Sequence, residues 1–210
     1  MPKRQIYSNN YYLFGLAAAV VYVLTIIIGG ELWPGYTIYQ AISELTLPTS
    51  PHRVPIIFSL VLFNILLLIH GIVIGKNLSH NRWFSFSSAV YAMTAVAGLL
   101  MASFPMDAPH TVFTSSGFIH RWMATNAIVG TVIIVFSSTI AFYQLKELRP
   151  LARLSLLFGI AVALTALGVW ISALRLSLAF GSFQKSSLGL FMIWLGWTSL
   201  ELRRRSSMLR

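Results

Sequence analysis

Long apolar runs separated by short polar stretches dominate the chain and predict membrane-spanning helices. A bilayer core of about 30 Å needs roughly 20 consecutive apolar residues to be crossed as a helix. Six segments have this length or approach it, and we expect a helix in each: residues 11–30, 54–75, 84–104, 117–143, 151–174 and 186–202. The loops are too short to hold a second domain. The pattern predicts an all-α, single-domain bundle of six transmembrane helices over residues 1–210.

The first long polar stretch, residues 31–53, contains a turn and then a helical pattern. Pro34-Gly35 is a turn signal. From Thr37 to Leu45 the apolar residues recur at helical spacing. We expect a short amphipathic helix here, lying in the membrane interface over the bundle. The alternative is a solvated loop in which Glu44 is an ordinary surface residue.

Composition agrees with a membrane protein and excludes several classes of site. The chain is 57% hydrophobic and only 10% charged, whereas soluble domains carry about 25% charged residues. It contains no cysteine, which excludes disulfides, thiolate zinc sites, iron–sulfur clusters and cysteine nucleophiles. Walker A, dinucleotide-binding and nucleophile-elbow motifs are also missing from the sequence. The sequence therefore names no reaction.

The basic residues, which give a net charge of +10, fall unevenly on the two sides of the predicted helices. Most lie at the termini or in the second and fourth loops, whereas four lie in or beside the other loops: Arg53, Arg121, Arg175 and Lys185. The positive-inside rule then places both termini in the cytoplasm. We expect residues 203–205, an arginine run, to contact anionic lipid headgroups. Nucleic acid is not an expected partner, because no aromatic side chains accompany the run.

Acidic residues and histidines collect on the predicted outer side: Glu31, Glu44, Asp107, His52, His110 and His120. Residues 114–116, Thr-Ser-Ser, offer an N-cap for the fourth helix, and His120 and Arg121 follow in its first turns. Because a helix N-terminus disfavours positive charge, His120 is expected to be neutral and able to accept a hydrogen bond or bind a metal. Arg121 is also a positive charge at this helix N-terminus, and a nearby carboxylate would offset that unfavourable charge. Asp107 and Glu44, with Glu31, are the candidate acids, and a purely structural ion pair is the alternative.

Short motifs at matching places relative to the predicted helices resemble one known family. They are Ile42-Ser-Glu-Leu45, Asn64 with Gly71, Phe104-Pro-Met-Asp107 and Gly117-Phe-Ile-His120. Their order resembles the bacterial and archaeal membrane family called domain of unknown function 998, although Thr46 stands where the family pattern has Gly. The resemblance implies a six-helix fold in a prokaryotic plasma membrane. It supplies no mechanism, but it points to the same outer residues as the charge distribution.

We expect the outer site to bind a lipid headgroup, a small amphiphile or a partner protein. The candidate ligand-binding residues are Ser43, Glu44, Asp107, His120 and Arg121. Membrane lipid is the expected partner, and a homo-oligomer is left open.

A membrane-embedded, metal-dependent hydrolase acting on lipid-like substrates is the main alternative. Asp107, His120, and His110 or His52 carry the nitrogen and oxygen atoms that zinc prefers. Glu44 could then act as general base on a metal-bound water, which makes Glu44, Asp107 and His120 the candidate catalytic residues. No H-E-x-x-H spacing supports this hypothesis.

Two further classes are disfavoured by the places of the polar residues. The middles of the predicted helices hold mainly Asn64, Thr125 and Asn126, with no acid, so ion transport is not expected. Haem is not expected as a cofactor, because the predicted depths of His70 and His120 differ by roughly 20 Å at about 1.5 Å per residue.

Overall fold

The computed structural model describes residues 9–108, 111–175 and 179–205, which contain helices and no strand. Six long helices follow one another: α1 (Leu13–Glu31), α2 (Arg53–Asn77), α3 (Arg82–Met101), α4 (Ser115–Gln144), α5 (Arg149–Leu174) and α6 (Phe180–Arg205). Two short 3₁₀ helices accompany them: η1 (Asn9–Tyr12) and η2 (Ile42–Thr46). The all-α prediction is confirmed.

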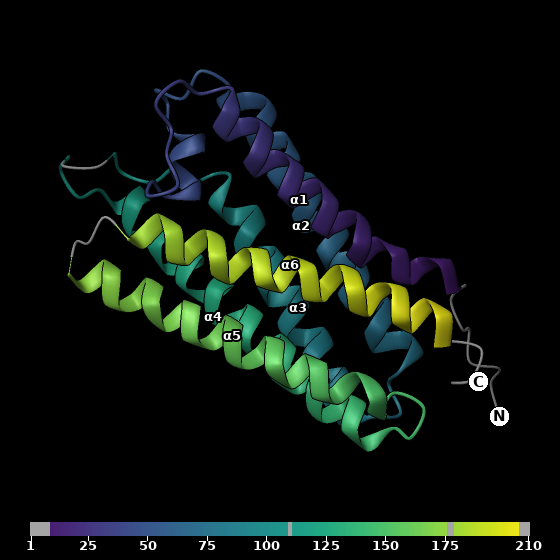
Figure 1. Ribbon diagram of the computed structural model, residues 1–210. Helices are drawn as coiled ribbons and strands as arrows, with labels where there is room; N and C mark the ends of the chain where they lie inside the picture. The colour runs from purple at the N-terminus through teal and green to yellow at the C-terminus, as the bar shows by residue number, and fades with distance from the viewer. Residues whose placement is uncertain (1–8, 109–110, 176–178, 206–210) are drawn as a thin grey trace.

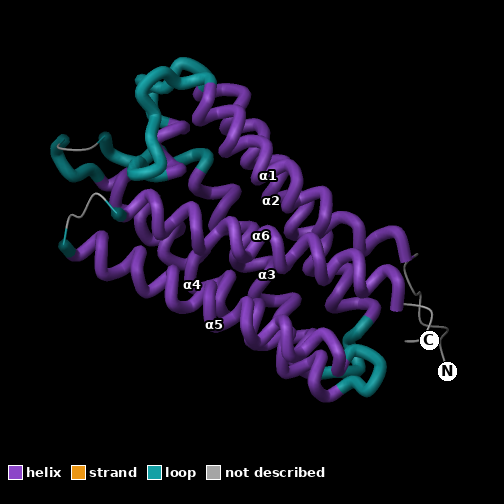
Figure 2. The backbone as a smooth tube through the Cα atoms, viewed as in Figure 1, coloured by secondary structure: helices purple, strands orange, loops and turns teal. Residues whose placement is uncertain are grey.

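The six helices form a closed ring (Figure 1). Each helix packs against the next one along the chain, and α6 packs against α1 as well as α5. The helices alternate in direction, so that α2, α4 and α6 begin at the same end of the bundle. The loop of residues 32–52, and residues 102–108 and 111–114 of the loop between α3 and α4, also lie at this end (Figure 2). We call it the mouth end; η1 packs on α6 at the other end.

Five of the helices are long and apolar enough to cross a membrane. They are α1 with the preceding η1, and α2, α3, α4 and α5. Helix α6 is as long as α5, but it is less apolar because polar residues lie in its first turns and three arginines in its last. The sequence pattern and the structure therefore agree on a multi-pass membrane protein.

Two elements differ from the predicted ones because polar side chains near helix ends bind neighbouring backbone groups. Helix α6 begins at Phe180 and not at residue 186, because Gln184 lies inside the bundle and accepts a hydrogen bond from the Ile42 amide at 2.8 Å. The expected helix near residues 37–45 is the shorter η2. The Gln40 side chain accepts from the Thr37 amide at 2.7 Å and so makes a turn there instead.

Small residues let α2 and α3 approach closely. The Cα atoms of Gly71 and Gly75 face Tyr91 and Ser88 on α3, with no room for a side chain. The Ser88 hydroxyl donates to the Gly71 carbonyl at 2.7 Å. Close backbone contact and interhelical hydrogen bonds are the main attractions between helices in lipid. Large side chains fill the ring away from the mouth end, among them the fully buried Phe84 and Phe142.

Candidate functional site

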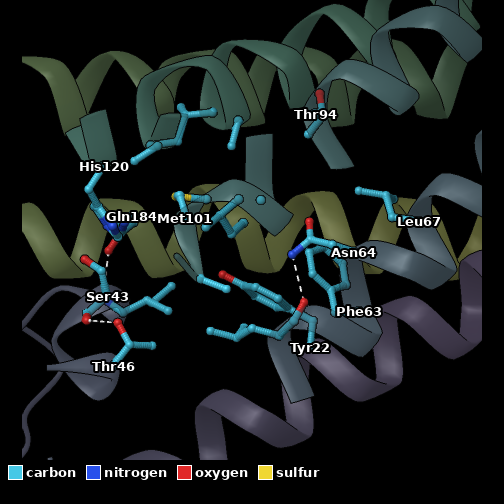
Figure 3. Close-up of a pocket in the computed structure, with 18 of the residues that line it drawn as sticks. Tyr22, Ser43, Thr46, Phe63, Asn64, Leu67, Thr94, Met101, His120 and Gln184 are labelled. Carbon is cyan, nitrogen blue, oxygen red and sulfur yellow. Dashed lines mark hydrogen bonds between the residues drawn. The ribbon is translucent and has the colours of Figure 1, made fainter. Parts of the chain in front are cut away.

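A cavity extends from the mouth end into the ring, between α1, α2, α3, α4 and α6 (Figure 3). Its internal space, taken as the volume that the centre of a water molecule can reach, is about 130 Å³. On α2 the wall runs from Arg53 to Leu67, a distance of about 21 Å at the helical rise of about 1.5 Å per residue. Cavities between the helices of a bundle are common small-molecule sites.

The wall is polar near the mouth and mostly apolar deeper in. Residues near the mouth come from four elements: Ser43 and Thr46 of η2, Arg53 of α2, His120 of α4 and Gln184 of α6. The deeper wall is built mainly from aliphatic and aromatic side chains, including Leu60, Phe63, Leu67, Ile128, Leu188, Phe191 and Met192. A few neutral polar residues interrupt it: Tyr22, Asn64, Thr94 and Thr131. The cavity is therefore amphipathic along its length.

Four buried polar atoms on this wall have no hydrogen-bond partner among the described residues: Tyr22 OH, Arg53 Nε, Thr94 Oγ1 and His120 Nε2. Buried polar groups in proteins are nearly always paired. Each unpaired group costs about 1–3 kcal/mol of folding free energy. Five other such atoms belong to described residues that do not line the cavity, so the four here are the ones that a molecule in the cavity can pair with.

The hydrogen bond of His120 fixes which ring nitrogen is available to a ligand. Nδ1 lies 2.8 Å from the carbonyl oxygen of Phe104. Because a carbonyl only accepts, Nδ1 carries the proton. Nε2, in a side chain that is 6% exposed, is left without a partner at the cavity wall. It can accept from a hydroxyl when the ring is neutral, and donate to an anionic oxygen when the ring is protonated.

Ser43 lies on the same wall as His120, so the structure brings these two predicted residues together (Figure 3). Ser43 is positioned by η2, which is held against α6 by the bond from Ile42 to Gln184. Thr46, at the end of η2, donates its hydroxyl hydrogen to the Ser43 carbonyl at 2.7 Å. Ser43 therefore sits on a turn that is bonded within itself and to α6.

Glu44 does not line the cavity, because its carboxylate is bound to the start of η2. One oxygen accepts from the Ala41 amide at 2.8 Å, and the other accepts from the Gln40 side chain at 3.1 Å. This arrangement satisfies an amide at the end of the 3₁₀ helix, which is a capping role.

Asp107 also lies off the cavity wall, at the start of α4. Its two oxygens accept from the hydroxyl of Thr114 at 2.6 Å and from the amide of Thr114 at 3.1 Å. Thr114 in turn accepts from the Gly117 amide at 3.1 Å, which confirms it as the N-cap of α4. These hydrogen bonds hold the pKa of the Asp107 carboxyl below its usual range. The bond from the Thr114 side chain has the larger effect, and the bond from its backbone amide the next largest.

Arg121 is exposed and does not line the cavity. Its guanidinium carbon lies 4.6 Å from the centroid of the Phe113 ring, a cation–π contact. No ion pair joins it to Glu44 or Asp107 in the described part of the chain. The five predicted ligand-binding residues therefore do not share one cavity: the wall holds two of them, and the other three pack around the mouth.

The metal candidates are not assembled by the described residues. His110 lies outside those residues, and His52 lines a separate groove between α1 and α2. Within residues 9–108, 111–175 and 179–205, no group of three or more His, Asp or Glu side chains lies close enough to hold a metal ion.

Residues 16–201 match the model of the family described as "Protein of unknown function (DUF998)". The chain belongs to this family. The predicted resemblance is thus confirmed over most of the sequence. Neither a curated protein nor a solved structure matches the chain.

The cavity of this DUF998 protein includes polar residues that the sequence pattern did not single out. Arg53 is the first residue of α2, where the positive end of the helix makes a cation unfavourable. Arg121 was singled out in the sequence for this reason. The same reason applies equally to Arg53, so the position of Arg53 at a helix N-terminus could have marked it as a candidate site residue. Tyr22 and Thr94 lie inside apolar runs, where only the structure shows that they face a cavity.

Proposed function

We propose that this DUF998 protein is a single-domain, six-span protein of a prokaryotic plasma membrane that binds a lipid-like amphiphile in its central cavity. Both termini lie in the cytoplasm, and the mouth end faces outward. The uneven distribution of Lys and Arg supports this orientation. In it α6 spans the membrane as one side of the closed ring, its polar first turns lying at the outer interface and its terminal arginines at the inner one.

The observation that carries the proposal is a wall that is polar near the mouth and mostly apolar deeper in, with four unpaired polar atoms among its residues. An apolar cavity surface favours the hydrocarbon part of a ligand. The polar atoms favour a ligand that also carries hydrogen-bonding groups. An amphiphile satisfies both requirements, and a cavity enclosed by helices accommodates a small molecule better than the surface of a partner protein.

Binding is favoured over catalysis by the positions of the acids. Glu44 and Asp107 accept hydrogen bonds from groups that hold η2 and α4 in place. Neither lines the cavity, so neither faces a ligand there as a general base. The residues of the predicted set that belong to the proposed site are Ser43 and His120, which suit the binding of a polar head.

The test of amphiphile binding is to fill the cavity and measure what co-purifies. Ala127 lines the cavity, whereas Ala89 is exposed on α3 and does not. Protein purified in detergent is extracted with organic solvent, and the extract is quantified by mass spectrometry. We expect the wild type and Ala89→Phe to retain the same amphiphile, and Ala127→Phe to lose most of it because the phenyl ring occupies its space.

Equal amounts of amphiphile in Ala127→Phe and Ala89→Phe would contradict the proposal, as would a wild type that carries none and gains no stability from any added amphiphile. Size-exclusion chromatography and helical circular dichroism of both variants show whether the bundle is intact.

A further inference from the structure

We infer that the amphiphile is an anion, whose carboxylate or phosphate head is bound by Arg53 while its apolar chain lies along α2 toward Leu67. This inference rests on the proposed function and names the class of ligand for that cavity.

The charge of the wall points to an anion. Among the described residues that line the cavity, Arg53 is the only one with a permanent charge, and none is an acid. Its side chain makes no ion pair with the described chain, and its buried Nε has no partner. The side chain is partly exposed, so the missing partner concerns Nε: a buried N–H without an acceptor is costly. An anionic head in the cavity supplies the missing counter-charge and accepts from Nε.

The helix directions add to this preference. Helices α2, α4 and α6 begin at the mouth end, and each contributes a polar cavity residue from its first two turns: Arg53, His120 and Gln184. The amino ends of helices carry partial positive charge and favour anions. Helix α3 ends at the same place, but the Phe104 carbonyl just beyond it is occupied by the His120 ring.

The depth of the wall fits the chain of such a molecule. Below Arg53 the α2 wall continues as Ile57, Leu60, Phe63 and Leu67. Fully buried Phe191 lies opposite on α6. These side chains are apolar, so a hydrocarbon chain can bind to them without the desolvation of any polar group among them. The head is thus placed at the mouth and the chain in the interior, which is the direction that insertion from the outer interface would give.

The experiment compares ligands that each contain sixteen carbon atoms and differ in the head. Palmitate, hexadecyl phosphate and neutral hexadecanol are titrated into wild-type protein in a maltoside detergent. Binding is read by native mass spectrometry and by the ligand-induced rise in Tm. We expect at least one of the two anions to bind on the order of tenfold more tightly than hexadecanol. Whichever of the two anions binds more tightly shows whether the site prefers a carboxylate head or a phosphate head.

Matched variants assign the preference to Arg53. Arg53→Gln is expected to lose on the order of tenfold in affinity for the anions, with little change for hexadecanol. Arg53→Lys keeps the charge and is expected to keep the preference for anions. Arg175→Gln removes the same charge from an exposed position at the mouth end that does not line the cavity, and it is expected to behave as wild type.

Equal affinity of the wild type for hexadecanol and both anions overturns the inference, while binding of an amphiphile remains. Unchanged anion affinity in a well-folded Arg53→Gln also overturns it. Because the ligand comparison uses wild-type protein, it decides the matter even where a variant fails to fold. If none of the three ligands binds and Ala127→Phe has no effect, the proposed function itself fails.

Discussion

Asp107 and His120 lie close to the start of α4, and their hydrogen bonds give them different tasks. Asp107 accepts two hydrogen bonds from Thr114, the N-cap residue of α4, and so ties the preceding loop to the start of that helix. His120 donates Nδ1–H to the Phe104 carbonyl, which leaves Nε2 at the cavity wall. Both oxygens of Asp107 are thus paired within the protein, whereas one ring nitrogen of His120 has no protein partner among the described residues.

Replacing Asp107 with Asn is expected to destabilise α4. It is also expected to make the thermal stability of the protein depend less on pH in the acid range. The pKa of this carboxyl is lower in the folded protein than its ordinary value of 3.8. Its stabilising contribution is therefore complete above that value and is lost as the pH falls through the lower, folded pKa. At neutral pH we expect Asp107→Asn to lower Tm by about 2–4 °C, the range typical of a lost cap.

Thermal unfolding followed between pH 7 and pH 3 measures this effect, because the wild type loses Asp107 stabilisation over the acid end of that range. Thr114→Val removes the hydroxyl that donates to Asp107 and is expected to act in the same direction. A Tm of Asp107→Asn equal to that of the wild type throughout would show that these bonds contribute nothing.

At the residue scale the sequence identifies polar groups near helix ends but does not say which of them are already satisfied. Ser43 and His120 were predicted and line the cavity; Glu44 and Asp107 were predicted and cap local backbone. The difference depends on which amide groups the folded loops bring within about 3 Å of each carboxylate, which spacing alone does not encode.

At the scale of elements, the loop between α1 and α2 is fastened to the beginning of α6. The Lys185 ammonium donates to the carbonyls of Thr37 at 3.2 Å and of Ile38 at 3.1 Å, and also to that of Gln40. It lies 4.6 Å from the centroid of the Tyr36 ring. The Gly181 amide donates to the Tyr39 carbonyl at 3.1 Å. These contacts hold η2 over the cavity.

Lys185→Met is expected to loosen this loop, because methionine keeps much of the length of the side chain but donates no hydrogen bond. We expect faster amide hydrogen exchange over residues 36–46, weaker amphiphile binding and little change in the rest of the bundle. Lys146→Met is the control, since Lys146 is exposed and lies in the loop between α4 and α5 at the opposite end. Exchange rates in residues 36–46 that match those of the control would mean that Lys185 does not hold the loop.

The elements themselves follow from hydropathy to within a few residues for α1 to α5. A run of apolar residues long enough to cross a bilayer has few alternatives to a helix, since backbone groups in lipid must bond within their own segment. The start of α6 could not be predicted from hydropathy. Gln184 and Lys185 are polar and look like loop residues in the sequence, because their hydrogen-bond partners in residues 37–42 are known only from the structure. The same long-range contacts make η2 short.

At the scale of the whole molecule, the cavity arises because the ring of helices is incompletely filled near the mouth end. Small residues such as Gly98, Ala124 and Ala127 line it. A side chain on Gly98 would collide with the Asn64 carboxamide. Hydropathy patterns report which residues are apolar, but not whether six helices leave a space between them. The position of a binding cavity was therefore predictable only as the outward end of the bundle.

The absence of cysteine from the sequence permits a direct test of which end faces outward. Thr111, in the loop between α3 and α4, and Ser79, in the loop between α2 and α3, are both exposed and lie at opposite ends of the bundle. Basic residues flank Ser79, so the positive-inside rule predicts that its loop lies in the cytoplasm. In intact cells, a membrane-impermeant maleimide is expected to label Thr111→Cys, and to label Ser79→Cys only after lysis. The reverse result would turn the mouth of the cavity toward the cytoplasm, and an amphiphile would then have to enter from the inner leaflet.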